Sequence, residues 1–335
     1  MTASHDRIPE IALDWIAAGK PAALATVIET WGSAPRPVGA QLAISSEAEL
    51  QGSVSGGCVE SAVVAEALDA LDDGQPRLLE FGISDDDAFA VGLACGGTIR
   101  IMVEPVDIGA GPPLTLIRDL VAARSNGQPV AYAVNPANWE RRLIAVGDPA
   151  DPLADAVAAA ATSDKSGFAD DWFLAVHNPP LNMIVVGAVH IAQPLRIIAE
   201  AAGYRLTLID PREAFGADHR FPGATLRNDW PDAAIAEIGI DSRTAIVTLS
   251  HDPKIDDPAL IASLRSQAFY IGALGSKRTH GKRVTRLEEA GFSAAEIARI
   301  HAPIGADIGA KSPAEIAISI MAEITERLRR PDTRR

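Results

Sequence analysis

The stretch Asn182-Met183-Ile184-Val185-Val186-Gly187 indicates the fold of the second half of the chain. A short apolar run that ends at a glycine and leads into a helical segment, here about 190–202, is typical of a strand buried in a parallel sheet. Further strands are predicted at 205–210, 245–249 and 268–272, with a helical run at 258–264. Because strands and helices alternate with short joins, residues 181–330 are predicted to form a Rossmann-like doubly wound parallel sheet.

The turn after this first strand stands where Rossmann folds carry the dinucleotide motif G-x-G-x-x-G/A. Gly187 and Ala192 fit the motif, but Val189 replaces the second glycine, which lets a pyrophosphate approach the backbone. Asp210 ends the next strand and would suit a ribose hydroxyl, although it can also be read as a simple strand end followed by Arg212. The topology is therefore predicted, whereas Val189 puts bound NAD(P) in doubt.

Polar loops follow two other predicted strands, at the edge where parallel sheets bind ligands. Residues 250–254 include His251, and residues 272–280 offer Ser276 and Lys277 to a phosphate. The histidines His190, His251, His280 and His301 would serve as metal ligands if they met at one edge. A structural role is the commoner outcome for histidine, and we expect it for at least two of these four. Lys282, Arg283 and Arg286 extend the positive charge, but a solvated helix face explains them equally well.

Residues 1–150 are predicted to form a mixed α/β domain. The expected helices lie at 8–18, 59–71 and 115–124, and the expected strands at 22–29, 40–45, 77–81, 99–104 and 130–134. The composition then shifts to Asp-Pro pairs and an alanine-rich run at 154–161. Residues 151–180 are therefore interpreted as a connector between the two domains, with at most one helix.

The loop Gly52-Ser53-Val54-Ser55-Gly56-Gly57-Cys58-Val59-Glu60 carries the clearest chemical signal of the first domain. Glycines allow close approach of a ligand, and free N–H groups at a helix start bind anions. A cysteine in the first turn of a helix is expected to have a lowered pKa, so that its thiolate can act as a nucleophile or metal ligand. The alternative is a simple turn with Cys58 as a small buried side chain.

A second loop, Cys95-Gly96-Gly97, mirrors Gly56-Gly57-Cys58, and these loops hold the only two cysteines of the chain. We expect the loops to meet, with both sulfur atoms facing one pocket, although two unrelated glycine turns remain an alternative. Two thiols are too few for a zinc site, which usually has four ligands. They suit a softer metal or a sulfur-bearing ligand.

Charge and composition exclude several classes of protein. The chain has 335 residues and a net charge of −14, with 26 acidic and 11 basic residues in 1–200 against 18 and 19 in 201–335. This charge speaks against a nucleic-acid-binding protein. The sequence has neither an apolar run long enough to cross a membrane nor a secretory signal, and two cysteines make no disulfide framework, so we expect a cytoplasmic protein without a membrane partner.

Taken together, these motifs resemble the XdhC/CoxI family of maturation factors for xanthine and carbon-monoxide dehydrogenases. The resemblance extends from about residue 10 to 325, apart from the region around 105–180. In the first domain it rests on residues 32–39, 52–60, 81–82 and 92–97; in the second it rests on residues 187–193, 210–212, 251–254, 270–276 and 304–310.

The resemblance implies a chaperone rather than an enzyme. Family members are thought to bind the molybdenum cofactor (molybdopterin), protect it while a cysteine desulfurase installs its terminal sulfur, and deliver it to an apo-molybdenum hydroxylase. It implies a homodimer and a possible molybdenum contact at Cys58. The residues assigned to cofactor binding are Arg36, Ser55, Gly56, Gly57, Cys58, Cys95, Gly96, Gly97, Gly187, His190, Asp210, His251, Ser276 and Lys277. An NAD(P)-dependent oxidoreductase and a docking protein without a ligand are the alternative hypotheses.

Overall fold

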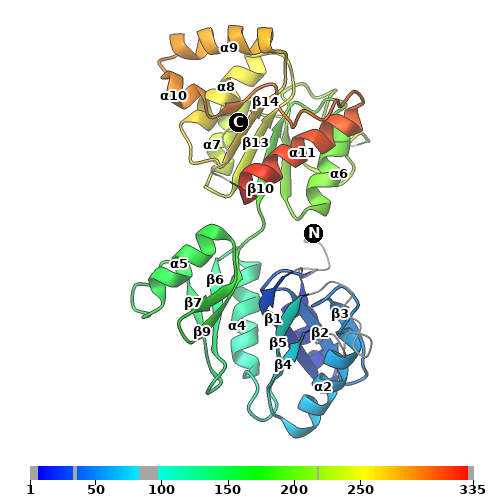
Figure 1. Ribbon diagram of the computed structural model, residues 1–335. Coiled ribbons are helices and arrows are strands. Elements are labelled where there is room, and N and C mark those ends of the chain that lie inside the picture. The colour runs from blue at the N-terminus through cyan, green and yellow to red at the C-terminus, as the bar shows by residue number, and fades with distance from the viewer. Residues whose placement is uncertain (1–6, 33–35, 83–96, 217–218, 331–335) are drawn as a thin grey trace. The chain divides into compact units, whose positions relative to one another are not determined.

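The computed structural model describes residues 7–32, 36–82, 97–216 and 219–330, which fold into two compact units (Figure 1). One unit spans Ser4–Pro179 and the other contains Pro180–Arg335. Each unit has its own hydrophobic core. Within the described residues, no helix is both long and apolar enough to cross a membrane.

The C-terminal unit is built on a six-stranded sheet in which all neighbouring strands are parallel. Its order is β12-β11-β10-β13-β14-β15, so the chain moves outward from β10 on one side and then returns to β13 on the other. The strands are β10 (Asn182–Val186), β11 (Arg205–Ile209), β12 (Thr225–Arg227), β13 (Thr244–Thr248), β14 (Tyr270–Ala273) and β15 (Ile300–His301). The predicted Rossmann-like sheet is thereby confirmed, with its reversal of strand order between β10 and β13.

Helices cover both faces of this sheet (Figure 1). The helices are α6 (Ala192–Ala201), α7 (Pro231–Ile238), α8 (Pro253–Leu264), α9 (Lys277–Glu289), α10 (Ala294–Ile297) and α11 (Pro313–Arg329). Met183 and Val185 pack in the core beneath α6 and α11, whereas Ile184 and Val186 pack in the core beneath α7, α8 and α9. Since successive side chains of a strand point to opposite faces, a continuously apolar strand supplies both cores.

The N-terminal unit contains a five-stranded antiparallel sheet of order β3-β2-β1-β5-β4. The strands are β1 (Ala22–Trp31), β2 (Gln41–Ser45), β3 (Leu50–Gly52), β4 (Arg77–Phe81) and β5 (Thr98–Pro105). Helix α2 (Glu60–Asp73) packs on one face, and α1 (Ile8–Ala17) packs on the other. The predicted mixed α/β character of this region is confirmed.

A second, four-stranded antiparallel sheet of order β7-β6-β9-β8 completes this unit. Its strands are β6 (Val130–Asn135), β7 (Glu140–Ala145), β8 (Gly167–Ala169) and β9 (Trp172–His177), and its helices are α4 (Leu114–Ser125) and α5 (Ala154–Ser163). Residues 151–179, within the range expected as a connector, therefore belong to the N-terminal unit, where they form α5, β8 and β9. The reason is that β9 pairs with β6 and buries Phe173 and Leu174 on its two faces.

A buried ion pair joins the two sheets of the N-terminal unit. Glu104 on β5 accepts hydrogen bonds from the Tyr132 hydroxyl at 3.1 Å and from the Arg141 guanidinium. Burial raises the pKa of Glu104, although Arg141 and Tyr132 act in the opposite direction. Removing one partner would leave a buried charge uncompensated, which is strongly destabilising. The pair therefore fixes β5 against β6 and β7.

A buried histidine gives this unit a predicted sensitivity to acid. His177 lies at the end of β9, with its Nδ1 atom 3.0 Å from a guanidinium nitrogen of Arg124. Burial, reinforced by Arg124, lowers the pKa of His177 to about 3. Below about pH 6.5 the unfolded chain binds a proton that the folded chain rejects, so stability should fall between pH 6.5 and 3, by about 1.4 kcal/mol per unit of pKa difference.

Urea unfolding at a series of pH values tests this effect. We expect His177→Gln to flatten the loss of stability below pH 6.5, whereas His219→Gln, which alters an exposed histidine, should leave the slope unchanged. An unchanged slope in the His177 variant would contradict the assignment.

Candidate functional site

The cysteine loop of the N-terminal unit is organised around one carboxylate. Glu60, the first residue of α2, accepts hydrogen bonds from a set of donors in the preceding loop. The donors are the Ser53 hydroxyl at 2.7 Å, the Ser55 hydroxyl, and the N–H groups of Val54 at 3.2 Å, Ser55 at 2.9 Å, Gly56 at 3.1 Å and Gly57 at 2.9 Å. Burial alone would raise the pKa of Glu60, but these bonds lower it to about 2, so the carboxylate is charged at neutral pH.

Cys58 is held in place through Ser55. The Ser55 hydroxyl donates to Glu60 and accepts the N–H groups of Cys58 and Val59, each at 3.0 Å. Cys58 is a half-buried free thiol that lies two residues before α2, not in the first turn of the helix as expected. Arg36 joins the same loop, because its Nε atom donates to the Ser53 carbonyl at 3.2 Å.

The expected oxyanion site is filled by the chain itself. The sequence assigned the N–H groups of Gly52–Gly57 to a bound anion, yet those of residues 54–57 donate to Glu60. Sequence reasoning missed Glu60 as a site residue. The available signal was an acid at the first helical position, three residues after a run of serines and glycines whose N–H and O–H groups need an acceptor.

The second glycine–cysteine loop is only partly described. Cys95 and Gly96 lie outside the described residues, so the predicted meeting of the two cysteine loops stays a prediction. Gly97 directly precedes β5, whose first residue, Thr98, is paired with Trp31 of β1.

In the C-terminal unit, the loops after β10 and β13 touch at the carboxyl edge of the sheet. Gly187 has φ +103°, and a Cβ atom there would lie 2.7 Å from the backbone nitrogen of Ser250. The next residue, His251, is exposed and has φ +61°, an unusual conformation for a residue with a side chain. Glycine is therefore required at 187 by packing and by backbone conformation, independently of any nucleotide.

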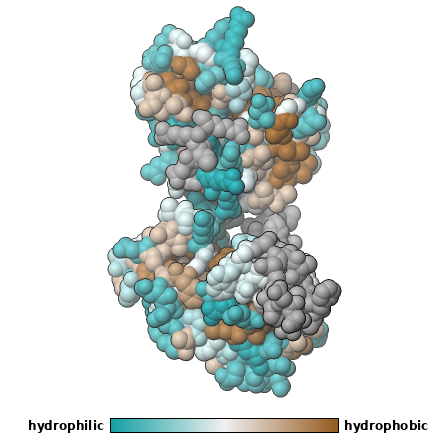
Figure 2. Space-filling model, viewed as in Figure 1, coloured by the Kyte–Doolittle hydropathy of each residue, from teal (hydrophilic) through white to brown (hydrophobic). Residues whose placement is uncertain are grey.

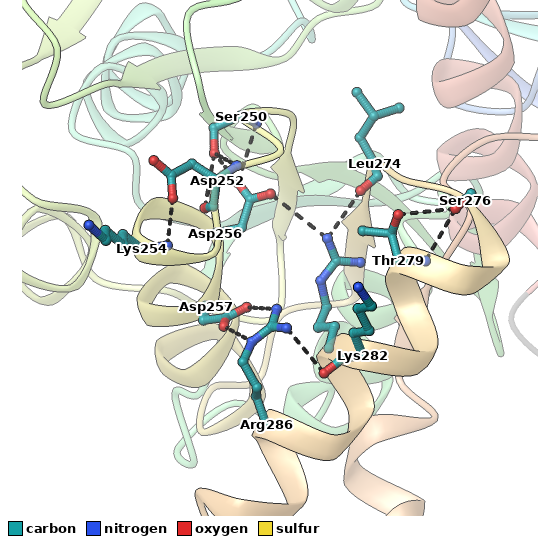
Figure 3. Close-up of polar contacts among 11 residues, drawn as sticks. Ser250, Asp252, Lys254, Asp256, Asp257, Leu274, Ser276, Thr279, Lys282 and Arg286 are labelled. Atoms are coloured by element: carbon teal, nitrogen blue, oxygen red, sulfur yellow. Dashed lines mark hydrogen bonds and ion pairs between the residues drawn. The ribbon is translucent and has the colours of Figure 1, made fainter.

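Figure 3 shows a polar network that links the loops after β13 and β14 through α8 and α9. Ser250 donates its hydroxyl to Asp256 at 2.7 Å. The other carboxylate oxygen of Asp256 lies 3.8 Å from the guanidinium of Arg283, which donates to the Leu274 carbonyl at 3.1 Å. Burial raises the pKa of Asp256 despite its bonds to Ser250 and the nearby Arg283. The network fixes both loops.

The three basic residues of α9, for which a ligand-binding charge and a solvated face were equally good explanations, have different roles in the structure. Arg286 forms an ion pair with Asp257 (Figure 3). Arg283 is buried, whereas Lys282 is exposed. Asp256 was not singled out from the sequence. Its spacing from the buried Leu260, one helical turn later, was the signal that it faces the core.

The carboxylate of Asp210 is already engaged by other groups of the protein and is not free to bind a ribose hydroxyl. It is fully buried, and it accepts the Ala188 N–H at 2.8 Å and the guanidinium of Arg212 at 2.8 and 2.9 Å. Burial alone would raise the pKa of Asp210, but the bonds from Arg212 and Ala188 lower it overall. A ribose hydroxyl would have to compete with a charge-assisted, two-point contact.

The remaining predicted residues of this unit lie on different elements and have different surroundings. Ser276 caps α9 by accepting the Thr279 N–H at 3.2 Å, and Lys277 follows it as the exposed first residue of the helix. His190 is exposed in the loop after β10, whereas His301 pairs with Glu323 at 3.1 Å in a structural contact. Among the described parts of the chain, no three or more His, Cys, Asp or Glu residues are grouped to hold a metal ion.

These features define a two-unit α/β protein with a thiol-bearing loop in one unit and a Rossmann fold in the other. Residues 183–324 match the XdhC Rossmann domain, and residues 15–82 match the XdhC and CoxI family. The chain belongs to the XdhC and CoxI family.

Relatives align over almost the whole chain. The molybdenum cofactor insertion chaperone PaoD of Escherichia coli (strain K12) is 30% identical over 97% of this chain and 89% of its own length. A protein of Bacillus subtilis (strain 168), described as a probable xanthine dehydrogenase subunit, is 26% identical over 92% of this chain and 94% of its own. A crystal structure described as a xanthine dehydrogenase from Bacillus halodurans, 23% identical, has a TM-score of 0.75 and covers 97% of this chain and 96% of its own, which shows the shared fold.

The contact between Gly187 and Ser250 yields a stability prediction. Gly187→Ala should destabilise the C-terminal unit by about 2 kcal/mol or more, because the new Cβ meets backbone and the left-handed conformation disfavours alanine. Gly281→Ala is the matched control. An added Cβ at this helical glycine would have no other atom within 4 Å, and alanine there should raise the free energy of unfolding by about 0.5–1 kcal/mol. Urea unfolding monitored by circular dichroism measures both variants, and equal stability of the two would contradict the packing argument.

Proposed function

We propose that this protein is a maturation factor that binds the molybdenum cofactor and inserts it into an apo-molybdenum hydroxylase. The observation that carries the proposal is the 30% identity to a named insertion chaperone across both units, over 97% of this chain. The proposal is supported by family matches in both units, the thiol-bearing loop lying in one matched region and the Rossmann fold in the other.

The chemistry of the cysteine loop fits the metal end of such a cofactor. A thiolate is a soft ligand of the kind that transition metals with sulfur ligands accept. Cys58 is half-buried and free, and its loop is fixed by Ser55 and Glu60. When bound, the cofactor would supply the molybdenum–sulfur centre that the hydroxylase needs. This chain would hold the centre near Cys58, and we expect Cys95, Gly96 and Gly97 to contribute from the second loop.

Taken by itself, the Rossmann unit offers groups that would suit a phosphate. Exposed cationic and polar groups stand at its carboxyl edge, namely His190, His251, Ser276 and Lys277. The start of α9 adds a partial positive charge that suits a phosphate. NAD(P) is the weaker candidate here, because Val189 replaces the motif glycine and Asp210 is engaged by Arg212.

The proposal also includes protection of the cofactor during sulfuration, a cysteine desulfurase as partner and a cytoplasmic site of action.

A homodimer is a further part of the proposal, and the surface of the C-terminal unit offers a candidate face for it. Ile197 on α6 and Ile318 on α11 are 68% and 51% exposed, and Figure 2 shows hydrophobic surface on this unit. Exposed apolar groups of this kind favour protein contacts.

Binding measurements on the full chain test the proposal. The purified protein is offered molybdenum cofactor and, in parallel, NAD(H) and NADP(H). We expect cofactor binding that weakens at least tenfold, about 1.4 kcal/mol, in Cys58→Ala, because a direct thiolate contact is lost. Cys58→Ser is the matched control for side-chain size, and Cys95→Ala tests the second loop. Tight dinucleotide binding without cofactor retention would favour the oxidoreductase instead.

A further inference from the structure

The Glu60 carboxylate saturates the anion-binding capacity of the cysteine loop. Successive backbone N–H groups that point into one concavity form a nest for anions, and here four of them converge on Glu60 with two hydroxyls. Gly56 and Gly57 have φ +82° and +115°, which aims their N–H groups inward at a conformation that side chains disfavour. A carboxylate offers about four acceptor positions, so all of them are in use.

The same carboxylate controls the immediate surroundings of Cys58. Glu60 accepts the Ser55 hydroxyl, and that hydroxyl accepts the Cys58 N–H, so two hydrogen bonds connect the acid to the cysteine backbone. Gly57, next to the thiol, donates directly to Glu60 at 2.9 Å. A free oxyanion that approached Cys58 would therefore meet a fixed negative charge and no vacant donor among these N–H groups.

We propose that Glu60 is a specificity-determining residue, which fills the oxyanion position of the cysteine loop and thereby excludes free oxyanions such as sulfate, phosphate and molybdate from Cys58. Cys58, whose side chain also packs against the core beneath α2, would then offer its half-buried thiol, rather than an oxyanion position, to a ligand. The inference rests on the proposed function only where it takes that ligand to be the molybdenum cofactor. It then assigns the metal end of the cofactor, rather than its phosphate, to this loop.

Alkylation of Cys58 tests the role of Glu60 without any cofactor. In a Cys95→Ala background Cys58 is the only cysteine, so its reaction rate with iodoacetamide reports on the loop. We expect the rate in the parent protein to be insensitive to formate, sulfate or molybdate at constant ionic strength. In Glu60→Ala the N–H and O–H donors that Glu60 had occupied should bind these anions. The alkylation rate of Cys58 should then change several-fold and saturably with anion concentration. Formate, which replaces the missing carboxylate, should restore the rate of the parent protein.

Two further variants separate occupancy of the site from general charge and from folding. Asp69→Ala removes an exposed acid from the same helix and should behave as the parent does. Glu60→Gln keeps the shape but removes the charge, so the ratio of iodoacetate to iodoacetamide rates should rise several-fold. This ratio remains informative if Glu60→Ala does not fold, which circular dichroism reports.

The proposal is overturned if sulfate or molybdate slows alkylation of the parent as much as that of Glu60→Ala. It is also overturned if folded Glu60→Ala ignores formate, or if the reagent ratio of Glu60→Gln equals that of the parent. These outcomes are independent of the proposed function, which fails separately if the unmodified protein does not bind molybdenum cofactor.

Discussion

A carboxylate removed from water must be given hydrogen-bond donors, and this requirement organises both units of the protein. Glu104 joins the two antiparallel sheets through Tyr132 and Arg141. Asp256 ties the loop after β13 to α9, and Asp210 ties the loop after β10 to the end of β11. Glu60 gathers the cysteine loop onto the start of α2. Each acid converts a set of otherwise unpaired donors into a fixed local geometry.

Two of these acids occupy places where an external ligand is the usual expectation. Glu60 fills the N–H nest beside Cys58, and Asp210 is paired with Arg212 where a Rossmann fold often holds a ribose. In the proposed function, ligand recognition would therefore fall to groups that the chain leaves exposed or half-buried. These are the thiol of Cys58 in one unit, and the start of α9 and nearby basic side chains in the other.

Local sequence patterns were sufficient to predict the strands and helices that are buried on both faces or along one periodic face. The apolar strands predicted at 182–186, 245–249 and 268–272 are typical of a covered parallel sheet, and the structure places the corresponding strands β10, β13 and β14 side by side. Residues 151–180 were misjudged because β9 is stabilised by pairing with β6, some 40 residues earlier in the chain, and its short Trp-Phe-Leu run carries no local signal of that partner.

The sequence by itself determined the Rossmann topology, the mixed α/β character of the first half, and the presence of a serine- and glycine-rich loop that ends in Cys58 and Glu60. Only the tertiary structure decided which acceptor those loop donors use, that Arg283 is buried against Asp256, and that Gly187 is required by the backbone of Ser250. The physical reason is that apolar periodicity is set by neighbours along the chain. A hydrogen bond depends instead on ångström-scale positions of atoms that folding brings together from distant segments.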